Sequence, residues 1–487
     1  MTRLLGTSEP SRHVFRGRGD GLVFLGLVVL LFIFPLARGG NRLWAVSLFD
    51  AMVFGLCALW LLCFIFGRVQ MPAAVSRARY VIFLWLLWLA YIAFQFVPLP
   101  LPLAETLAPL SVEKYAAVAA VTGEPLHAAA ISISRGDTFD HLLESTGLLA
   151  LFLLVLFTVR GNRRMHFLAM TLVCGGLFQA LYGILFYLSG LDRGLFLDAA
   201  SPLNVVTGTF VNRNHLAGYL EIAAAAGIGL VLADLKGGGA SNWRARFRHF
   251  VEFLMSETVL LRVFLAIMVI ALVMSQSRMG NVAFFSSIGV AGMIYVVLRE
   301  RQLFFKSLFV FATLFLIDFL ILSNWFGLDA LVERIETTEM SREMRVAVMP
   351  DLLRAFEAYW PMGSGLGSFY TAFPEFRSPE IPKLHYHAHN DYLEFGIETG
   401  IWGLALLGGI VALVMWRAVL LLVKRKDRLV GGIAFAAIMA VVALGIHGTV
   451  DFNLQIPANA AALVALLGLV MSCSPEGRRH SNGGRQA

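Results

Sequence analysis

The 487-residue sequence contains few charged residues. Asp, Glu, Lys and Arg make up 15% of the chain, hydrophobic residues make up 58%, and the mean hydropathy is +0.74. A soluble protein of this length would have about 25% charged residues. The apolar residues also occur in runs that are long enough to cross a hydrocarbon core of about 30 Å as a helix. The runs are unbroken rather than alternating, which predicts a bundle of membrane helices.

Cysteine is also scarce. Cys57, Cys63, Cys174 and Cys473 all fall within or at the ends of apolar runs, so the sequence offers neither a disulfide framework nor a metal site. Residues 1–20 are polar and lack the basic leader and cleavage site of a removed signal peptide. We therefore expect the first apolar run to remain as a membrane span.

Twelve apolar runs predict the fold class, an all-α polytopic membrane protein with about 12 transmembrane helices. The predicted spans are residues 21–37, 44–66, 80–97, 142–159, 166–188, 216–234, 259–274, 280–298, 307–324, 396–423, 429–448 and 457–473. The largest predicted loop, residues 325–395, precedes the tenth span. An even number of spans would place both ends of the chain on one side of the membrane.

The distribution of Lys and Arg predicts the orientation of these spans. Segments on the side of the termini hold 24 Lys and Arg residues, whereas segments on the other side hold 13, of which six lie in the long loop. Because positive residues are enriched in short cytoplasmic loops, both termini are predicted to be cytoplasmic. The loops at residues 98–141, 189–215 and 325–395 are then extracytoplasmic. The net charge of +7 is explained by this asymmetry and does not indicate nucleic-acid binding.

The stretch "HYHAHNDYLEFGIETGIWG", residues 385–403, places polar chemistry directly before an apolar run. Asp391 and Glu394 have the spacing of a helix capping box, which predicts a helix that begins near Asn390. His389 then lies just ahead of a helix N-terminus, where anions are favoured. A neutral imidazole there can act as a general base near pH 7. The alternating histidines offer no tetrahedral ligand set, so no metal is predicted.

Arginines on the same predicted side of the membrane could bind phosphate. Arg278, in "SQSRMG", lies in a tight connection, where a guanidinium suits phosphate but could equally reach lipid headgroups. The long loop holds Arg334, Arg342, Arg345 and Arg354, whose spacing also suits a solvated helix with i,i+4 ion pairs. A histidine and two arginines would fit attack by a hydroxyl on a sugar carried by a lipid pyrophosphate, because cations stabilise the leaving group. No cofactor is needed for this reaction.

Three stretches, in this order, resemble the C-terminal core of the O-antigen ligase and O-antigen polymerase superfamily of bacterial membrane glycosyltransferases. They are "SQSRMG", "RVAVMPDLLRAFEAYWPMGSGLGSF" and "HAHNDYLEFGIETGIWG". The ligase signature, His-Asn, nine residues, Gly, two residues and Gly, matches His389, Asn390, Gly400 and Gly403. "TGTFVNRNHLAGYLE" and "HGTVDFNLQIPAN" are also similar to family stretches, so the resemblance covers about residues 200–460. The chain departs from many members at Trp360, where they have proline.

The resemblance implies a GT-C-type fold and an undecaprenyl-pyrophosphate-linked glycan donor. It also implies inverting, metal-independent transfer at the periplasmic face of the bacterial inner membrane. By motif, the catalytic residues of the family correspond to His389, Arg278 and Arg345. Asn390 and Asp391 are predicted to orient the histidine, and Arg213, His215 and His387 are predicted to contact substrate. The expected partners are the lipid-linked donor, lipid A-core or a growing glycan as acceptor, membrane lipids, and other polysaccharide-assembly proteins.

The predicted domain organisation follows from the spans and the resemblance. Residues 1–20 form a cytoplasmic tail, residues 21–190 form N-terminal transmembrane helices, residues 191–473 form the catalytic membrane domain, and residues 474–487 form a disordered cytoplasmic tail. The sequence leaves the acceptor open, because ligases, polymerases and protein-glycosylating relatives share this chemistry. A transporter or flippase of lipid-linked saccharides is the alternative from another class. It would be favoured by discontinuous helices or inverted repeats, which the sequence does not indicate.

Overall fold

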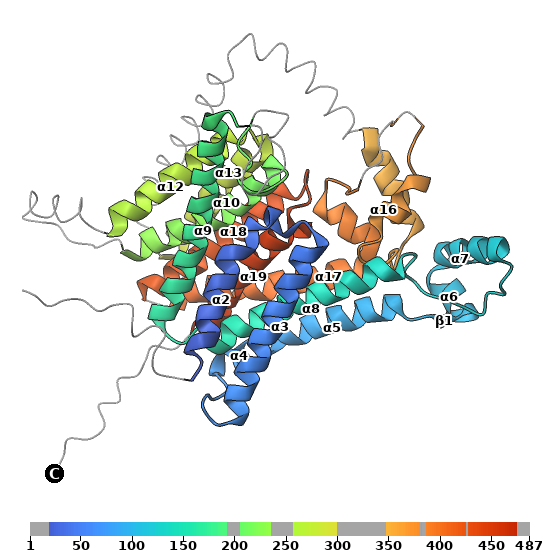
Figure 1. Ribbon diagram of the computed structural model, residues 1–487, viewed down its shortest axis with the longest axis horizontal. Helices are drawn as coiled ribbons and strands as arrows, with labels where there is room; N and C mark the ends of the chain where they lie inside the picture. The colour runs from blue at the N-terminus through green and yellow to red at the C-terminus, as the bar shows by residue number, and fades with distance from the viewer. Residues whose placement is uncertain are drawn as a thin grey trace, which may run out of the picture.

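The computed structural model describes residues 19–191, 205–234, 257–299, 347–379, 381, 386–424 and 427–474. Most of these residues are helical (Figure 1). The helices of the membrane bundle are α2 (Gly21–Ile33), α3 (Leu43–Ile65), α4 (Ala73–Arg77), α5 (Arg79–Phe96), α8 (Arg135–Thr158), α9 (Asn162–Ser189), α10 (Arg213–Asp234), α12 (Glu257–Met274), α13 (Arg278–Arg299), α17 (Asp391–Lys424), α18 (Arg428–His447) and α19 (Pro457–Ser472). Short 3-10 turns extend α2 at Phe34–Leu36 (η1) and Arg38–Gly40 (η2), and another, Asn453–Gln455 (η5), precedes α19.

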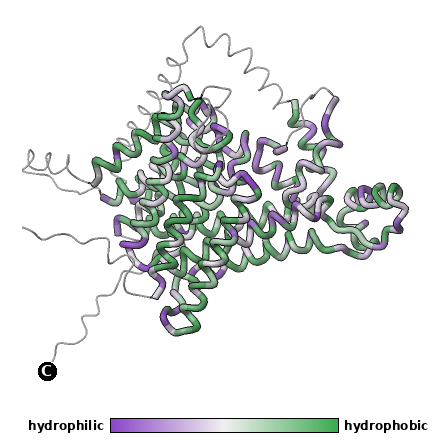
Figure 2. The backbone as a smooth tube through the Cα atoms, viewed as in Figure 1, coloured by the Kyte–Doolittle hydropathy of each residue, from purple (hydrophilic) through white to green (hydrophobic). Residues whose placement is uncertain are grey.

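The smaller elements lie outside this bundle. Two strands, β1 (Leu99–Pro100) and β2 (Ala128–Ala129), pair antiparallel and enclose α6 (Leu101–Leu107) and α7 (Pro109–Thr122). This unit projects from the ends of α5 and α8 (Figure 1). The helix at residues 347–358 leads into α16 (Phe369–Ala372) and η4 (Phe373–Glu375). Hydrophobic residues dominate the long helices, whereas hydrophilic stretches are frequent around α16 (Figure 2).

The described helices confirm an all-α polytopic membrane protein. Eight of them, α3, α5, α8, α9, α10, α13, α17 and α18, are long and apolar enough to cross a membrane. The apolar helices that contain α2, α12 and α19 are shorter. These eleven helices coincide with eleven of the predicted spans, and the remaining one, residues 307–324, lies outside the described residues. The total of twelve spans and the GT-C type stay predictions.

Helices α10 and α18 form the centre of the bundle. In the most apolar window of each helix, 78% of the α10 residues and 72% of the α18 residues are buried, against 28% in α3, α5 and α17. The two central helices touch through glycines, because a Cβ on Gly229 would lie 2.3 Å from the carbonyl oxygen of Gly432. Small residues allow such close backbone contact between membrane helices. The two helices therefore pack closely at the centre of the bundle.

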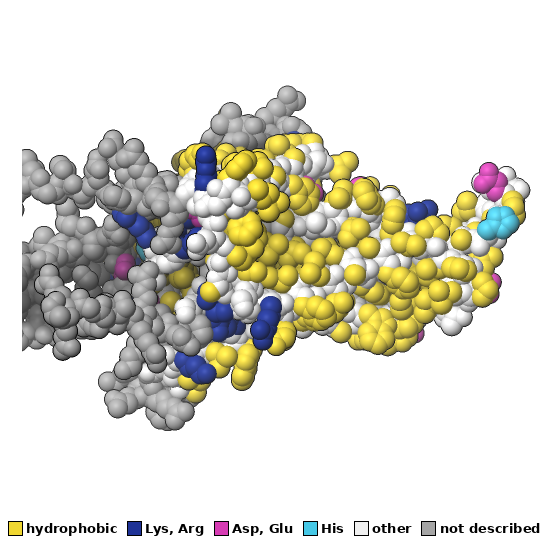
Figure 3. Space-filling view, turned by 90° about the horizontal axis from the view of Figure 1, so that it is seen from below, with side chains coloured by type: hydrophobic (Ala, Val, Ile, Leu, Met, Phe, Trp, Pro, Cys, Tyr) yellow, Lys and Arg dark blue, Asp and Glu magenta, His cyan; other side chains and the backbone are white. Residues whose placement is uncertain are grey.

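A broad hydrophobic band covers the face shown in Figure 3, and Lys and Arg side chains gather mainly beside one end of it. The outward-facing residues of this kind include Leu59, Leu62, Phe83, Leu86 and Trp416, which are exposed. Exposed apolar side chains along several adjacent helices are expected where lipid, rather than water, surrounds a protein. The surface therefore agrees with the membrane class that composition predicted.

Helix α17 is interrupted at Gly400. This residue has φ 59° and ψ −163°, a conformation that is open almost only to glycine. A Cβ at this position would lie 1.9 Å from the carbonyl oxygen of Pro361. The first nine residues of α17 thus form a separate helical segment ahead of the long apolar part.

Backbone carbonyls freed at this break are bonded by a glycine-rich loop and by α5. Ser364 N–H donates to the Ile397 carbonyl and Gly365 N–H donates to the Glu398 carbonyl, both at 2.9 Å. The Gln95 amide donates to the Glu398 carbonyl at 3.0 Å, as does the Tyr91 hydroxyl to the Thr399 carbonyl. This glycine-rich loop, "GSGLGSF" at residues 363–369, is therefore a closely packed turn, as its glycines indicate, and it holds the start of α17 in place.

Candidate functional site

The predicted helix start near Asn390 is confirmed. Asn390 caps α17, because its side-chain oxygen accepts a hydrogen bond from Leu393 N–H at 3.0 Å. Its amide group donates to the Thr449 carbonyl at 2.9 Å. Glu394 does not complete a capping box. Its carboxyl group instead accepts from Ala388 N–H at 2.8 Å and lies 2.6 Å from His387 Nδ1.

Asp451 is the centre of the site, between the ends of three helices. It lies in the connection from α18 to α19, is fully buried, and accepts a hydrogen bond from the Asn214 amide in the first turn of α10. Its Oδ1 is 3.5 Å from His389 Nδ1 and 3.8 Å from His215 Nε2. Burial alone would raise the pKa of this carboxyl group, but the imidazoles of His215 and His389 hold the pKa well below its usual value. Asp451 is therefore a carboxylate at neutral pH.

His389 combines a fixed backbone with a partly open side chain. Its φ of 50° is uncommon for a residue other than glycine, and places it directly ahead of the α17 cap. Its side chain is 31% exposed, and its ring meets the Phe452 ring edge to face at 5.0 Å. Nδ1 is the ring nitrogen that faces Asp451. A carboxylate beside an imidazole can set the orientation of the ring and support its action as a general base.

His387 packs on the same aromatic ring but has a different environment. Its imidazole stacks on Phe452, with centroids 4.0 Å apart and planes at 14°. Burial lowers the pKa of His387 to about 4 and outweighs the attraction of the Glu398 carboxylate. The ring is therefore neutral at pH 7, and its contact with Glu394 fixes its orientation.

The first turns of α10 and α13 bring cationic residues to the same end of the bundle. Arg213 begins α10, and His215, two residues later, is buried against Asp451. Arg278 begins α13 and is exposed. The two turns touch, because a Cβ on Gly280 would lie 2.6 Å from Ala217 Cβ. The structure thus brings Arg278, Arg213 and His215 to one end of the bundle, the end at which α17 begins.

The other predicted site residues have different positions. Arg345 lies outside the described residues, although the helix that follows it is described from residue 347. Asp391 is buried, and its carboxyl group accepts from Leu454 N–H at 3.3 Å. Asp391 and Asn390 both form hydrogen bonds to the connection between α18 and α19. The group that faces His389 is Asp451.

Sequence reasoning missed Asp451, Phe452 and Asn214 as members of the site. A signal was present, because "HGTVDFNLQIPAN" places an acid beside an aromatic residue at the end of an apolar run. An ionisable residue at such a boundary indicates a function or a buried partner. Glu221, which lies inside the bundle, also has a buried partner, because its carboxyl group is 2.8 Å from His447 Nδ1.

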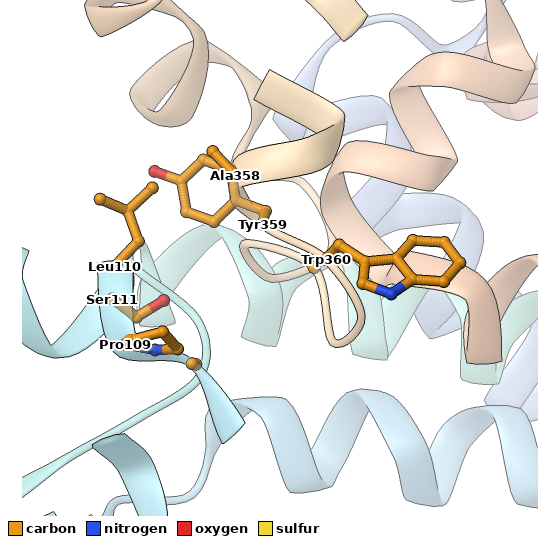
Figure 4. Close-up of a pocket in the computed structure, with 8 residues that line it drawn as sticks. Pro109, Leu110, Ser111, Ala358, Tyr359 and Trp360 are labelled. Atoms are coloured by element: carbon orange, nitrogen blue, oxygen red, sulfur yellow. The ribbon is translucent and has the colours of Figure 1, made fainter. Parts of the chain in front are cut away.

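A shallow open pocket lies apart from these residues, between the start of α7 and the end of the 347–358 helix (Figure 4). Its empty volume is about 180 Å³, and it is lined by Ala108, Pro109, Leu110, Ser111, Ala358, Tyr359, Trp360 and Gly363. None of the predicted site residues lines it. Among the described residues, no group of three or more His, Cys, Asp or Glu side chains is arranged to hold a metal ion.

Comparison with known families gives one match. Residues 263–408 match the family model described as O-antigen ligase. The chain carries an O-antigen ligase domain. The matched range contains Arg278, Arg345, His389 and the two signature glycines, whereas Asp451 and the first turn of α10 lie outside it. No curated protein matches the chain.

Proposed function

We propose that the protein transfers a glycan from an undecaprenyl-pyrophosphate donor to an acceptor hydroxyl, with inversion at the anomeric carbon and without a metal. The observation that carries this proposal is the meeting of His389 and Asp451 at the end of the bundle where α10 and α13 begin with Arg213 and Arg278. The O-antigen ligase domain supports this class of reaction. The acceptor is lipid A-core in a ligase and a growing glycan in a polymerase.

In the proposed reaction, His389 removes the proton of the acceptor hydroxyl. The acceptor oxygen forms a bond to the anomeric carbon, and the bond from that carbon to the pyrophosphate oxygen breaks, with the electron pair leaving on the phosphate. The proton resides on Nε2 of His389 and then passes to solvent. Asp451 stabilises the imidazolium that forms, because an ionised carboxylate lies 3.5 Å from Nδ1.

Cations and helix starts would stabilise the leaving pyrophosphate. Arg278 supplies a charge that persists at any physiological pH and a planar set of donors that suits phosphate oxygens. Arg345 is proposed as its partner from the family motif. The N-termini of α10 and α13 add partial positive charge on the same side. Charge neutralisation at the bridging oxygen lowers the barrier without a cofactor.

The proposed location of this site is the periplasmic face of the bacterial inner membrane, with both termini in the cytoplasm. Within the described residues, Arg68 and Arg160 lie in connections, and Arg77, Arg79 and Arg163 lie in helical turns beside them, at the opposite ends of the helices from His389. Arginines around short connections support a cytoplasmic position for that end. A reaction that needs no ATP suits the periplasmic side of the membrane.

The break in α17 does not favour a transporter. Discontinuous helices in transporters expose freed backbone groups to an ion or substrate near the membrane midplane. Here the carbonyls of Ile397, Glu398 and Thr399 are bonded to α5 and to the glycine-rich loop. The break therefore holds the short helical segment in place rather than opening a path across the bilayer.

The function is tested with purified protein in nanodiscs, supplied with lipid-pyrophosphate-linked glycan and acceptor. We expect release of free lipid pyrophosphate in step with glycan growth on the acceptor. The same protein in liposomes should leave the sidedness of intact donor unchanged. Movement of intact donor without release of lipid pyrophosphate would instead support the transporter.

A further inference from the structure

Two exposed tyrosines stack on each other beside the start of α17. Tyr370 belongs to α16, and Tyr386 lies in the loop that leads to the α17 cap. Their ring centroids are 4.7 Å apart and their planes differ by 3°. Tyr370 is 42% exposed and Tyr386 is 68% exposed, so much of both rings is open to solvent.

This pair lies next, along the chain, to the aromatic groups around the proposed base. His387 follows Tyr386 directly and stacks on Phe452, and His389 meets the edge of the same Phe452 ring. One short loop therefore carries aromatic side chains that contact α16 through Tyr386, and Phe452, next to Asp451, through His387 and His389.

The chemistry of the pair fits a saccharide. A pyranose ring presents an apolar C–H face with hydroxyl groups at its edge, and a tyrosine ring presents an apolar face with a hydroxyl group at its edge. A phosphate would need cationic donors instead, which the pair does not supply. Exposed apolar surface next to convergent polar groups is typical of a ligand site.

The position of the pair indicates which saccharide it holds. Arg213 and Arg278 begin α10 and α13, whereas α16 lies across the start of α17 from these helices (Figure 1). In an inverting displacement, the acceptor oxygen approaches the anomeric carbon from the side opposite the leaving phosphate. We propose that Tyr370 and Tyr386 bind the sugar rings of the acceptor glycan and lead its hydroxyl group to His389. This inference rests on the function proposed above.

The surface is tested first by binding, without any donor. The probe is the polysaccharide that mild acid hydrolysis releases from the envelope of the bacterium that makes the protein. Saturation-transfer NMR on the purified protein should show that Tyr370→Ala and Tyr386→Ala each weaken binding about five- to tenfold, the loss expected for one aromatic contact. Tyr386→Phe should bind within about twofold of wild type because it keeps the ring. Tyr80→Ala, which removes an equally exposed tyrosine at the start of α5, should bind as wild type.

Wild-type affinity in both alanine variants would overturn the proposal, as would equal weakening by Tyr386→Phe. Tyr370→Ala lies outside the histidine loop, so it tests the surface even where Tyr386→Ala fails to fold. In the transfer assay, both alanine variants should raise the KM for acceptor and leave the KM for donor unchanged. A rise in the donor KM alone would overturn the assignment to the acceptor. Wild-type protein that binds the polysaccharide through these tyrosines but transfers none would contradict the proposed function while leaving the surface supported.

Discussion

Replacement of Asp451 by asparagine tests the proposed base and its orientation. The substitution keeps the size of the side chain and an oxygen that can accept from the Asn214 amide, but it removes the negative charge that faces His389 at 3.5 Å. Unit charges about 4 Å apart interact by about 4 kcal/mol in an effective dielectric of about 20. Because His389 is 31% exposed, we reduce this to about 2–3 kcal/mol of lost stabilisation of the imidazolium.

Such a loss corresponds to a decrease in kcat of about 30- to 150-fold. The wrong tautomer of His389 would add to the loss, because an amide can donate to Nδ1 where the carboxylate only accepts. The assay is steady-state release of lipid pyrophosphate at saturating donor and acceptor. Asp351→Asn is the matched control, since Asp351 is also a buried carboxylate but bonds to Arg354 and Ser378 instead. Asp451→Asn with a kcat within threefold of the control would refute the reasoning.

The remaining predictions concern the start of α17. Gly400→Ala should lower the thermal unfolding temperature and the folded yield, because the added Cβ would clash with the Pro361 carbonyl oxygen. Gly408→Ala is the control and should be neutral, because a Cβ there meets nothing within 4 Å. Equal unfolding temperatures for the two variants would contradict this prediction. Gln95→Leu should destabilise the protein by about 2–4 kcal/mol in denaturant unfolding, because it removes the buried hydrogen bonds of the Gln95 amide to the Met362 and Glu398 carbonyls and to Leu366 N–H. A loss below about 1 kcal/mol would count against that role. The pKa of His387 is lowered from 6.5 to about 4 in the folded protein, so the unfolded chain binds more protons between these pH values. Stability should therefore fall as the pH drops from 6.5 to 4, and His387→Asn should reduce this fall in the melting temperature. An unchanged dependence of the melting temperature on pH would argue against this prediction.

The helices and the start of α17 could be predicted from the sequence. Long apolar runs gave spans that match the described helices, because a membrane helix is specified by local composition. The polar stretch before α17 predicted a helix start and a histidine ahead of it, since capping also depends on neighbouring residues. These features need no knowledge of distant contacts.

The partners of the site residues could not be predicted in the same way. His389 faces Asp451, and His215 approaches the same carboxylate from far earlier in the chain. Such contacts depend on how α10, α17 and α18 pack, which local pattern does not specify. The conformation of Gly400 is similar, because its need for glycine arises from Pro361 in another loop. Signature glycines therefore indicated a family without revealing their physical task.

The most direct test of the central claim is the rate of lipid pyrophosphate release by His389→Ala. The account predicts at least a 100-fold loss of turnover, the scale of general base catalysis, with donor binding and thermal unfolding close to wild type. His127→Ala, which changes an exposed histidine near the projecting α7, should retain full turnover. Turnover by His389→Ala equal to that of His127→Ala would contradict the proposed role of this histidine.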